Sequence, residues 1–142
     1  MQAWLSSGSH RYYTEGDVVF WRMVDVMDEV HLKQLLAAVD GVLLAFRRLV
    51  LLVDCAQARS LTPEARRCYG DWLKNCPQPD RASIFFSASG EMRTFLLLAQ
   101  RSGQLLSGQR SAIEIVEDEA AARQRAAVLR AQWSAGRQEL KG

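Results

Sequence analysis

The order of apolar and polar positions along the chain predicts strands alternating with helices. A short aromatic segment at 9–15 and an apolar segment at 18–27 flank the turn "EGD", which is typical of a β-hairpin. Three later apolar segments, at 49–54, 82–89 and 112–118, predict further strands. The first of these, "LVLLVD", has no polar alternation, so we expect a central strand covered on both faces.

Apolar residues at steps of three and four predict helices at residues 28–46, 62–76, 91–106 and 118–133. Asp28, Thr62 and Asp118 suit the N-cap positions, and Pro63 suits the first position of the second helix. The stripe of the first helix consists of Leu32, Leu35, Leu36, Val39, Leu43 and Phe46.

The predicted order is β-β-α-β-α-β-α-β-α, which indicates the α/β class. Strands joined by helices favour a mixed, mostly parallel sheet covered by helices, with the opening hairpin as an antiparallel edge. The length of 142 residues suits a single domain over 1–142, with a core at about 10–133 and flexible ends.

Composition and charge limit the partners, the cellular compartment and the cofactors that we expect. The net charge of +2, from 18 basic and 16 acidic residues, is too even to favour nucleic acid or an anionic membrane as a partner. No apolar run is long enough to cross a bilayer, and the first residues lack the apolar core of a signal peptide.

The cysteine count is odd, 3, and no CxxC occurs, so we expect free thiols in the cytoplasm. His10 and His31 have no neighbours at metal-ligand spacing, so we expect neither a metal nor another cofactor.

The segment "LVLLVDCAQARSLTPEARR", residues 49–67, predicts a strand, a polar loop at 55–64 and a helix. Asp54 ends the strand like a phospho-acceptor of receiver domains, but the segment "AIEIVEDEAAAR" at the last strand offers no lysine and the acidic pair is a poor match. Cys55, directly after Asp54, is a candidate accessible thiol. The loop "SASGEMR" at 87–93 contains neither a nucleotide-binding motif nor a GxSxG elbow. We therefore do not expect an enzyme.

The order of elements, the segment 49–67 and the segment "RASIFFSASGEMRTFLLLAQ" resemble the STAS domain, the fold of bacterial anti-sigma-factor antagonists. The resemblance extends over about residues 10–133 and implies a bacterial regulatory domain that binds another protein, such as a kinase or anti-sigma-like partner. In partner-switching members a phosphorylated serine lies in an Asp-Ser-Ser-Gly motif, expected here at about 62–65. This chain has Thr62-Pro63-Glu64-Ala65 instead, which predicts that the usual phosphorylation switch is missing.

Two residues stay candidate phospho-acceptors, Ser60 and Thr62, although a capping role is favoured for Thr62. Glu64 either imitates a permanent phosphate or only suits the helix dipole. We expect the loop, the following helix and the helix at 91–106 to form one recognition surface. Its proposed residues are Arg59, Ser60, Thr62, Glu64 and Arg67, with Leu97 and Leu98 as apolar area.

Two alternatives remain open. The leucines of the helix at 91–106 either extend a docking patch or are buried locally. The second function class is a STAS-like domain that binds a small ligand, a nucleotide or a lipid. A pocket between the loops after residues 54 and 89 would favour the ligand, and a flat face with exposed leucines would favour a protein partner. A homodimer is a further option.

Overall fold

The computed structural model describes residues 3–76, 80–107 and 113–141, except for the side chains of 102–107 and 137–141. Its strands are β1 (Leu5–Ser7), β2 (His10–Glu15), β3 (Val18–Met27), β4 (Leu49–Leu61), β5 (Arg81–Phe86) and β6 (Ile113–Val116). Its helices are α1 (Glu29–Phe46), α2 (Pro63–Asn75), α3 (Gly90–Ser107) and α4 (Glu119–Lys141).

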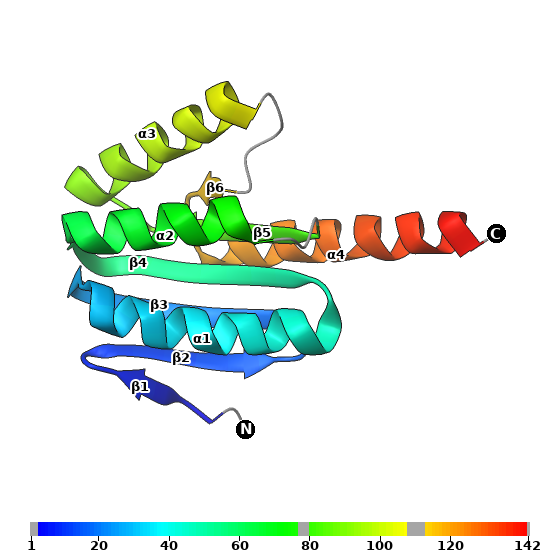
Figure 1. The fold of residues 1–142 in the computed structure, drawn as a ribbon, viewed down its shortest axis with the longest axis horizontal. Coiled ribbons are helices and arrows are strands. Elements are labelled where there is room, and N and C mark those ends of the chain that lie inside the picture. Colours follow the sequence, from blue (N-terminus) through cyan, green and yellow to red (C-terminus); the bar gives the residue numbers. More distant parts are fainter. Residues whose placement is uncertain (1–2, 77–79, 108–112, 142) are drawn as a thin grey trace.

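The six strands form one sheet in the order β1-β2-β3-β4-β5-β6 (Figure 1). β2 pairs antiparallel with both β1 and β3, whereas β3 to β6 pair in parallel. The predicted hairpin, the mixed sheet and the alternation of strands with helices are confirmed. The strand β1 was missed because its sequence, "LSS", is short and polar, and it is held by pairing with β2 rather than by an apolar pattern.

The helices cover both faces of the sheet. α1, α2 and α3 pack on one face, and α4 packs on the other against β4 and β5. Figure 1 shows α1 and α2 in front of the strands and α4 behind them, running past the end of the sheet. α4 continues to Lys141, beyond the predicted end near Trp133, because Gly136 is tolerated in an otherwise helix-forming segment.

The core is divided by the sheet into two clusters, as expected for strands covered on both faces. Val50 and Leu52 lie in the cluster under α4, and Phe85 lies in the cluster under the other three helices. All three side chains are buried, and Val50 and Leu52 confirm the expectation for the strand at 49–54. The stripe of α1 is also confirmed, with the exception of Phe46. Phe46 is 46% exposed because it is the last residue of α1, where the chain turns toward β4.

Candidate functional site

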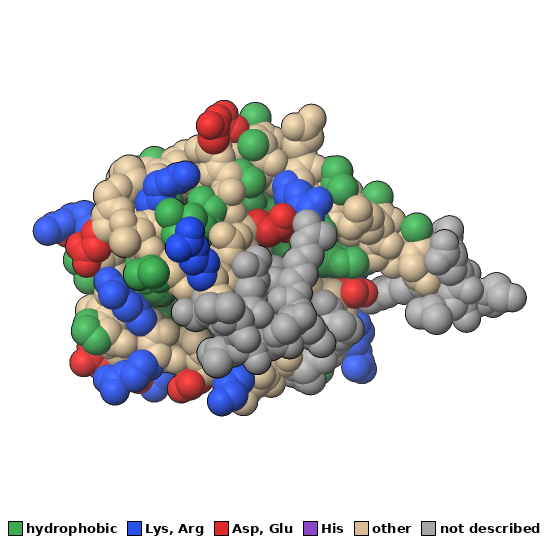
Figure 2. All heavy atoms as spheres, turned by 90° about the horizontal axis from the view of Figure 1, so that it is seen from above, with side chains coloured by type: hydrophobic (Ala, Val, Ile, Leu, Met, Phe, Trp, Pro, Cys, Tyr) green, Lys and Arg blue, Asp and Glu red, His purple; other side chains and the backbone are tan. Residues whose placement is uncertain are grey.

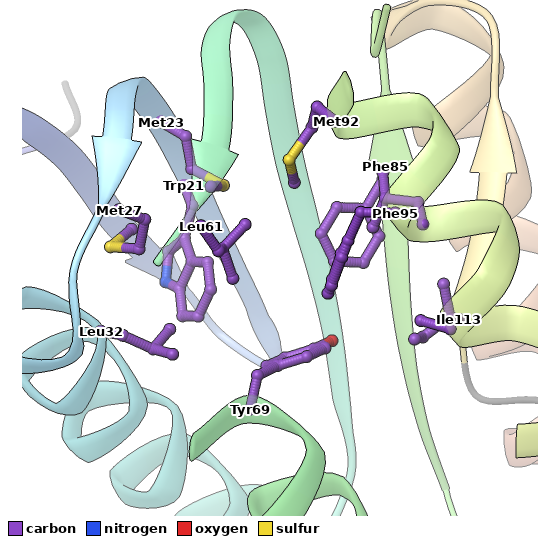
Figure 3. Close-up of a pocket in the computed structure, with 12 residues that line it drawn as sticks. Trp21, Met23, Met27, Leu32, Leu61, Tyr69, Phe85, Met92, Phe95 and Ile113 are labelled. Atoms are coloured by element: carbon purple, nitrogen blue, oxygen red, sulfur yellow. The ribbon is translucent and has the colours of Figure 1, made fainter. Parts of the chain in front are cut away.

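The strands β3 and β4 extend together beyond the rest of the sheet. β5 accompanies β4 only as far as Asp54, which lies opposite Phe86. From there on, residues 57–61 pair with residues 24–27 of β3 alone, across two irregularities of register. Figure 3 shows the two strand ends bending over toward the helices. We call this ribbon the β3–β4 extension, defined by residues 24–27 and 57–61.

The predicted loop at 55–64 is therefore wrong, because β4 continues to Leu61. The segment has the composition of a loop since one side of a two-stranded ribbon faces solvent. Ala56, Gln57 and Arg59 are exposed, whereas Cys55 and Leu61 point into the core. The polar residues of this segment thus lie on a paired strand, which holds them more rigidly than a loop would.

Asp54 marks the point where β4 leaves β5. Its carboxylate accepts a hydrogen bond from the backbone N–H of Ala56 at 3.0 Å and forms an ion pair with Arg22 at 3.3 Å. The carboxylate therefore stabilises the bend in β4.

Thr62 caps α2, as the sequence predicted. Its hydroxyl accepts a hydrogen bond from the N–H of Ala65 at 3.1 Å, and Pro63 occupies the first turn. Its own N–H donates to the carbonyl of Met27 at 3.0 Å. Thr62 thus fixes the start of α2 to the end of β3, and Glu64 lies in the favourable first turn of the helix.

Arg66, which sequence reasoning missed, connects three elements at this end of the molecule. Its Nε donates to the carbonyl of Leu61 at 3.1 Å, and its guanidinium pairs with Glu91 of α3 at 3.3 Å. The same guanidinium lies 4.8 Å from the ring centre of Phe95. Nothing local in "PEARR" distinguishes Arg66 from Arg67, since only the position of α3 gives Arg66 its partners.

The other charged residues of the proposed surface form exposed pairs. Arg59 meets Asp25 at 3.2 Å across the β3–β4 extension, and Arg67 meets Glu64 at 4.0 Å along α2. The side chains of both arginines are 76% exposed. Such pairs add little stability, so these groups are available to a partner at small cost.

Leu97 and Leu98 are exposed, at 40% and 60%, which excludes local burial for these two leucines. Leu98 follows Glu91 and Phe95 along the flank of α3 that faces Arg66. Leu97 lies on another flank with Gln100, whose amide donates to the carbonyl of Ile113 in β6. The structure therefore brings Leu98 to the α2 side of α3 and directs Leu97 away from it. In Figure 2, which looks down on α3, apolar side chains are interspersed with Lys and Arg.

A small apolar pocket lies between α3, α2, α1 and the sheet (Figure 3). It is lined by Trp21, Met23, Met27, Leu32, Leu61, Tyr69, Phe85, Met92, Phe95, Leu96, Ala99 and Ile113. Its free volume is about 20 Å³, the room of roughly one water molecule. The pocket is a gap in the core beneath α3 and does not lie between the loops after residues 54 and 89.

The buried thiol and the buried phenol of this region are unreactive. Cys55 is 1% exposed, which excludes this residue as the candidate accessible thiol. Burial, followed by the charge of Asp54, raises the pKa of the Cys55 thiol to about 12. Burial also raises the pKa of Tyr69, whose hydroxyl donates to Ser83 at 2.7 Å. Within the described ranges, no group of three or more His, Cys, Asp or Glu side chains is placed to hold a metal ion.

Comparison with known proteins identifies the fold. No protein-family model and no curated protein sequence matches the chain. Among solved structures, the chain is similar to an uncharacterized protein of the DUF3478 family with a SpoIIAA-like fold from Shewanella loihica PV-4. That similarity has a TM-score of 0.54 at 14% identity and covers 87% of this chain and 90% of the other.

A second similarity is to the anti-sigma factor antagonist SpoIIAA in its unphosphorylated form. It has a TM-score of 0.54 at 11% identity and covers 89% of this chain and 97% of the other. The chain thus has a SpoIIAA-like, that is STAS-like, fold, which confirms the resemblance seen in the sequence. Within the part of the chain that the structure describes, no helix combines the length and apolar character needed to span a bilayer.

Proposed function

We propose that this chain is a non-enzymatic regulatory domain of bacterial type that acts by binding another protein in the cytoplasm. The contact surface consists of the β3–β4 extension, the first two turns of α2 and the α2-facing flank of α3. Its residues are Arg59, Ser60, Thr62, Glu64, Arg67 and Leu98, with Leu97 at its margin. The fold shared with an anti-sigma factor antagonist supports a protein partner such as a kinase or an anti-sigma-like protein.

The observation that carries this proposal is the connection made by Arg66. Because Arg66 contacts Leu61, Glu91 and Phe95, three elements present their exposed side chains as one fixed surface. Binding to a preformed surface costs less conformational entropy than binding that must first order a loop. Exposed pairs such as Asp25–Arg59 supply specificity, since they can exchange their mutual contact for a partner's charges.

The experiment compares two baits in a pull-down from the native cells. One bait carries Arg59→Glu with Glu64→Lys, and its matched control carries Arg11→Glu with Glu117→Lys, an equal charge exchange at exposed positions on β2 and after β6. We expect a protein captured by the unmodified chain to be captured by the control and lost from the test variant. With the purified partner, the test variant should weaken binding about tenfold, or ~1.4 kcal/mol. Equal binding by both variants would refute the proposed surface.

A second candidate function, binding of a small apolar ligand, is favoured by the pocket beneath α3. Its described lining contains no charged side chain, which favours a lipid-like molecule over a nucleotide. The indole N–H of Trp21, which is buried at the pocket wall, has no hydrogen-bond acceptor within the described structure. Since the gap holds about 20 Å³, a ligand requires α3 to move outward.

Native mass spectrometry of the protein from its own cells tests this second candidate. An apolar adduct that disappears in Ala99→Trp, whose ring takes up more than the room of the gap and so blocks the space of a ligand, would support it. Leu98→Trp is the control, because this neighbouring side chain is 60% exposed and the added ring would lie outside. An adduct of equal abundance in both variants, or no adduct in the unmodified protein, would refute it.

A further inference from the structure

A groove of about 490 Å³ lies between the C-terminal halves of α1 and α2. It is lined by Asp40, Leu43, Leu44, Asp71, Trp72, Asn75 and Cys76. Figure 1 shows the two helices side by side, with their C-terminal ends at the end of the molecule opposite the β3–β4 extension. The groove is therefore separate from the recognition surface proposed above.

The groove combines negative charge with exposed apolar area. Among the described residues that line it, two are aspartates, one from each helix, and none is Lys or Arg. Asp40 accepts a hydrogen bond from the indole N–H of Trp72 at 2.8 Å, which fixes one carboxylate against one wall. Asp71 is exposed and forms no ion pair with a described residue. Leu44 is 76% exposed, the highest value among the large apolar side chains that the structure describes.

We propose that this groove docks a basic amphipathic helix of a partner protein. Two helices lying side by side present a trough that accepts a third helix, whose apolar side chains would contact Leu44 and the ring of Trp72. Lys or Arg side chains on the flanks of that helix would face Asp40 and Asp71, which have no cationic partner in the described structure. The same two carboxylates repel the phosphates of nucleic acids and anionic lipids, so neither class of partner suits the groove.

The probe is a designed helical peptide of about fifteen residues, made of Leu and Lys with the leucines on one face. Its binding to the full chain is followed by NMR at low salt, with the Trp72 indole N–H and the Leu44 methyl groups as reporters. We expect the largest shifts at these two residues. A peptide with Glu in place of Lys should bind at least tenfold more weakly, because its charges would then oppose those of the groove.

Matched variants locate the binding. Asp71→Asn should weaken the Leu/Lys peptide about threefold to fivefold, as expected for one exposed ion pair, whereas Glu117→Gln removes an equal charge elsewhere and should change nothing. Leu44→Ser should weaken binding further, and Arg59→Glu with Glu64→Lys should leave it unchanged. Shifts centred on another surface, or equal affinity in Asp71→Asn and Glu117→Gln, would overturn the proposal. Because the groove and the recognition surface share no residue, each proposal can fail without the other.

Discussion

The Nδ1 atom of His10 accepts a hydrogen bond from the backbone N–H of Val24 at 3.0 Å, so the imidazole must be unprotonated at that nitrogen. Val24 begins the β3–β4 extension, and His10 lies on the neighbouring strand β2, 2% exposed. The groups that face the ring are His31, 6.0 Å away between ring centres, and Asp28, which pairs with His31 at 2.8 Å. The hairpin, the start of α1 and the extension therefore meet at one buried imidazole.

The first prediction is a loss of stability in mild acid. Burial and then the charge of His31 lower the pKa of His10 below 6.5, outweighing Asp28 and a hydrogen bond with Val26, which raise it. The unfolded chain therefore binds this proton more readily than the folded chain does. The contribution of His10 to the free energy of unfolding is fully present above the unfolded pKa, and it falls as the pH drops below about 6.5. One proton accounts for at most about 1.4 kcal/mol per pH unit.

Urea unfolding between pH 7.5 and 5.5 measures this effect. His10→Asn is the control, because its amide oxygen can accept from Val24 but does not titrate. A free energy of unfolding that falls equally in both proteins would place the titration in another group.

The second prediction concerns the central strand. Leu52 is 1% exposed and lies between Phe20 of β3 and Ile84 of β5. Leu52→Ala should lower the free energy of unfolding by roughly 2–5 kcal/mol, because it leaves a cavity that the neighbouring strands cannot close. Leu98→Ala, at an exposed position, should change it by less than about 0.5 kcal/mol. A loss below about 1 kcal/mol for Leu52→Ala in denaturant melts would contradict its place in the core.

The sequence predicted those parts of the fold that depend on local patterns. The continuous apolar run ending at Asp54 and the caps Asp28, Thr62 and Asp118 each fix an element through its own residues. The β3–β4 extension was not predictable in this way, because its polar residues have the composition of a loop and only pairing with β3 makes them a strand. Arg66 and the contact between His10 and His31 depend on elements far apart in the sequence, so no local spacing indicated them.

The third prediction separates the two roles considered for Thr62. Thr62→Ala removes the hydrogen bond to the N–H of Ala65 and should lower the free energy of unfolding by about 1 kcal/mol. Thr62→Ser keeps a capping hydroxyl and should lose much less. Both variants should bind a partner within a few-fold of the unmodified chain. A large loss of binding in Thr62→Ala at unchanged stability would mean that the hydroxyl contacts the partner.

The fourth prediction compares two adjacent arginines. Arg66→Ala removes one hydrogen bond, one ion pair and one contact with an aromatic ring, and should cost about 1 kcal/mol of stability. Arg67→Ala removes only a 4.0 Å pair with Glu64 and should cost less than about 0.5 kcal/mol. Thermal or urea unfolding measures both. Equal effects would show that Arg66 does not connect α2 with α3.

The last prediction is that neither Ser60 nor Thr62 acts as a phosphorylation switch. The hydroxyl of Thr62 already binds the first turn of α2, Pro63 follows it directly, and both candidate side chains are half-buried on a paired strand or a helix cap. A kinase would have to open this backbone before it could reach either oxygen, although a phosphate at the start of a helix is electrostatically favourable. Intact-mass and peptide mass spectrometry of the protein from its native cells should therefore find unmodified Ser60 and Thr62 as the major species. Abundant phosphate on either residue, together with loss of the captured partner, would show instead that a switch operates at a position shifted from the usual one.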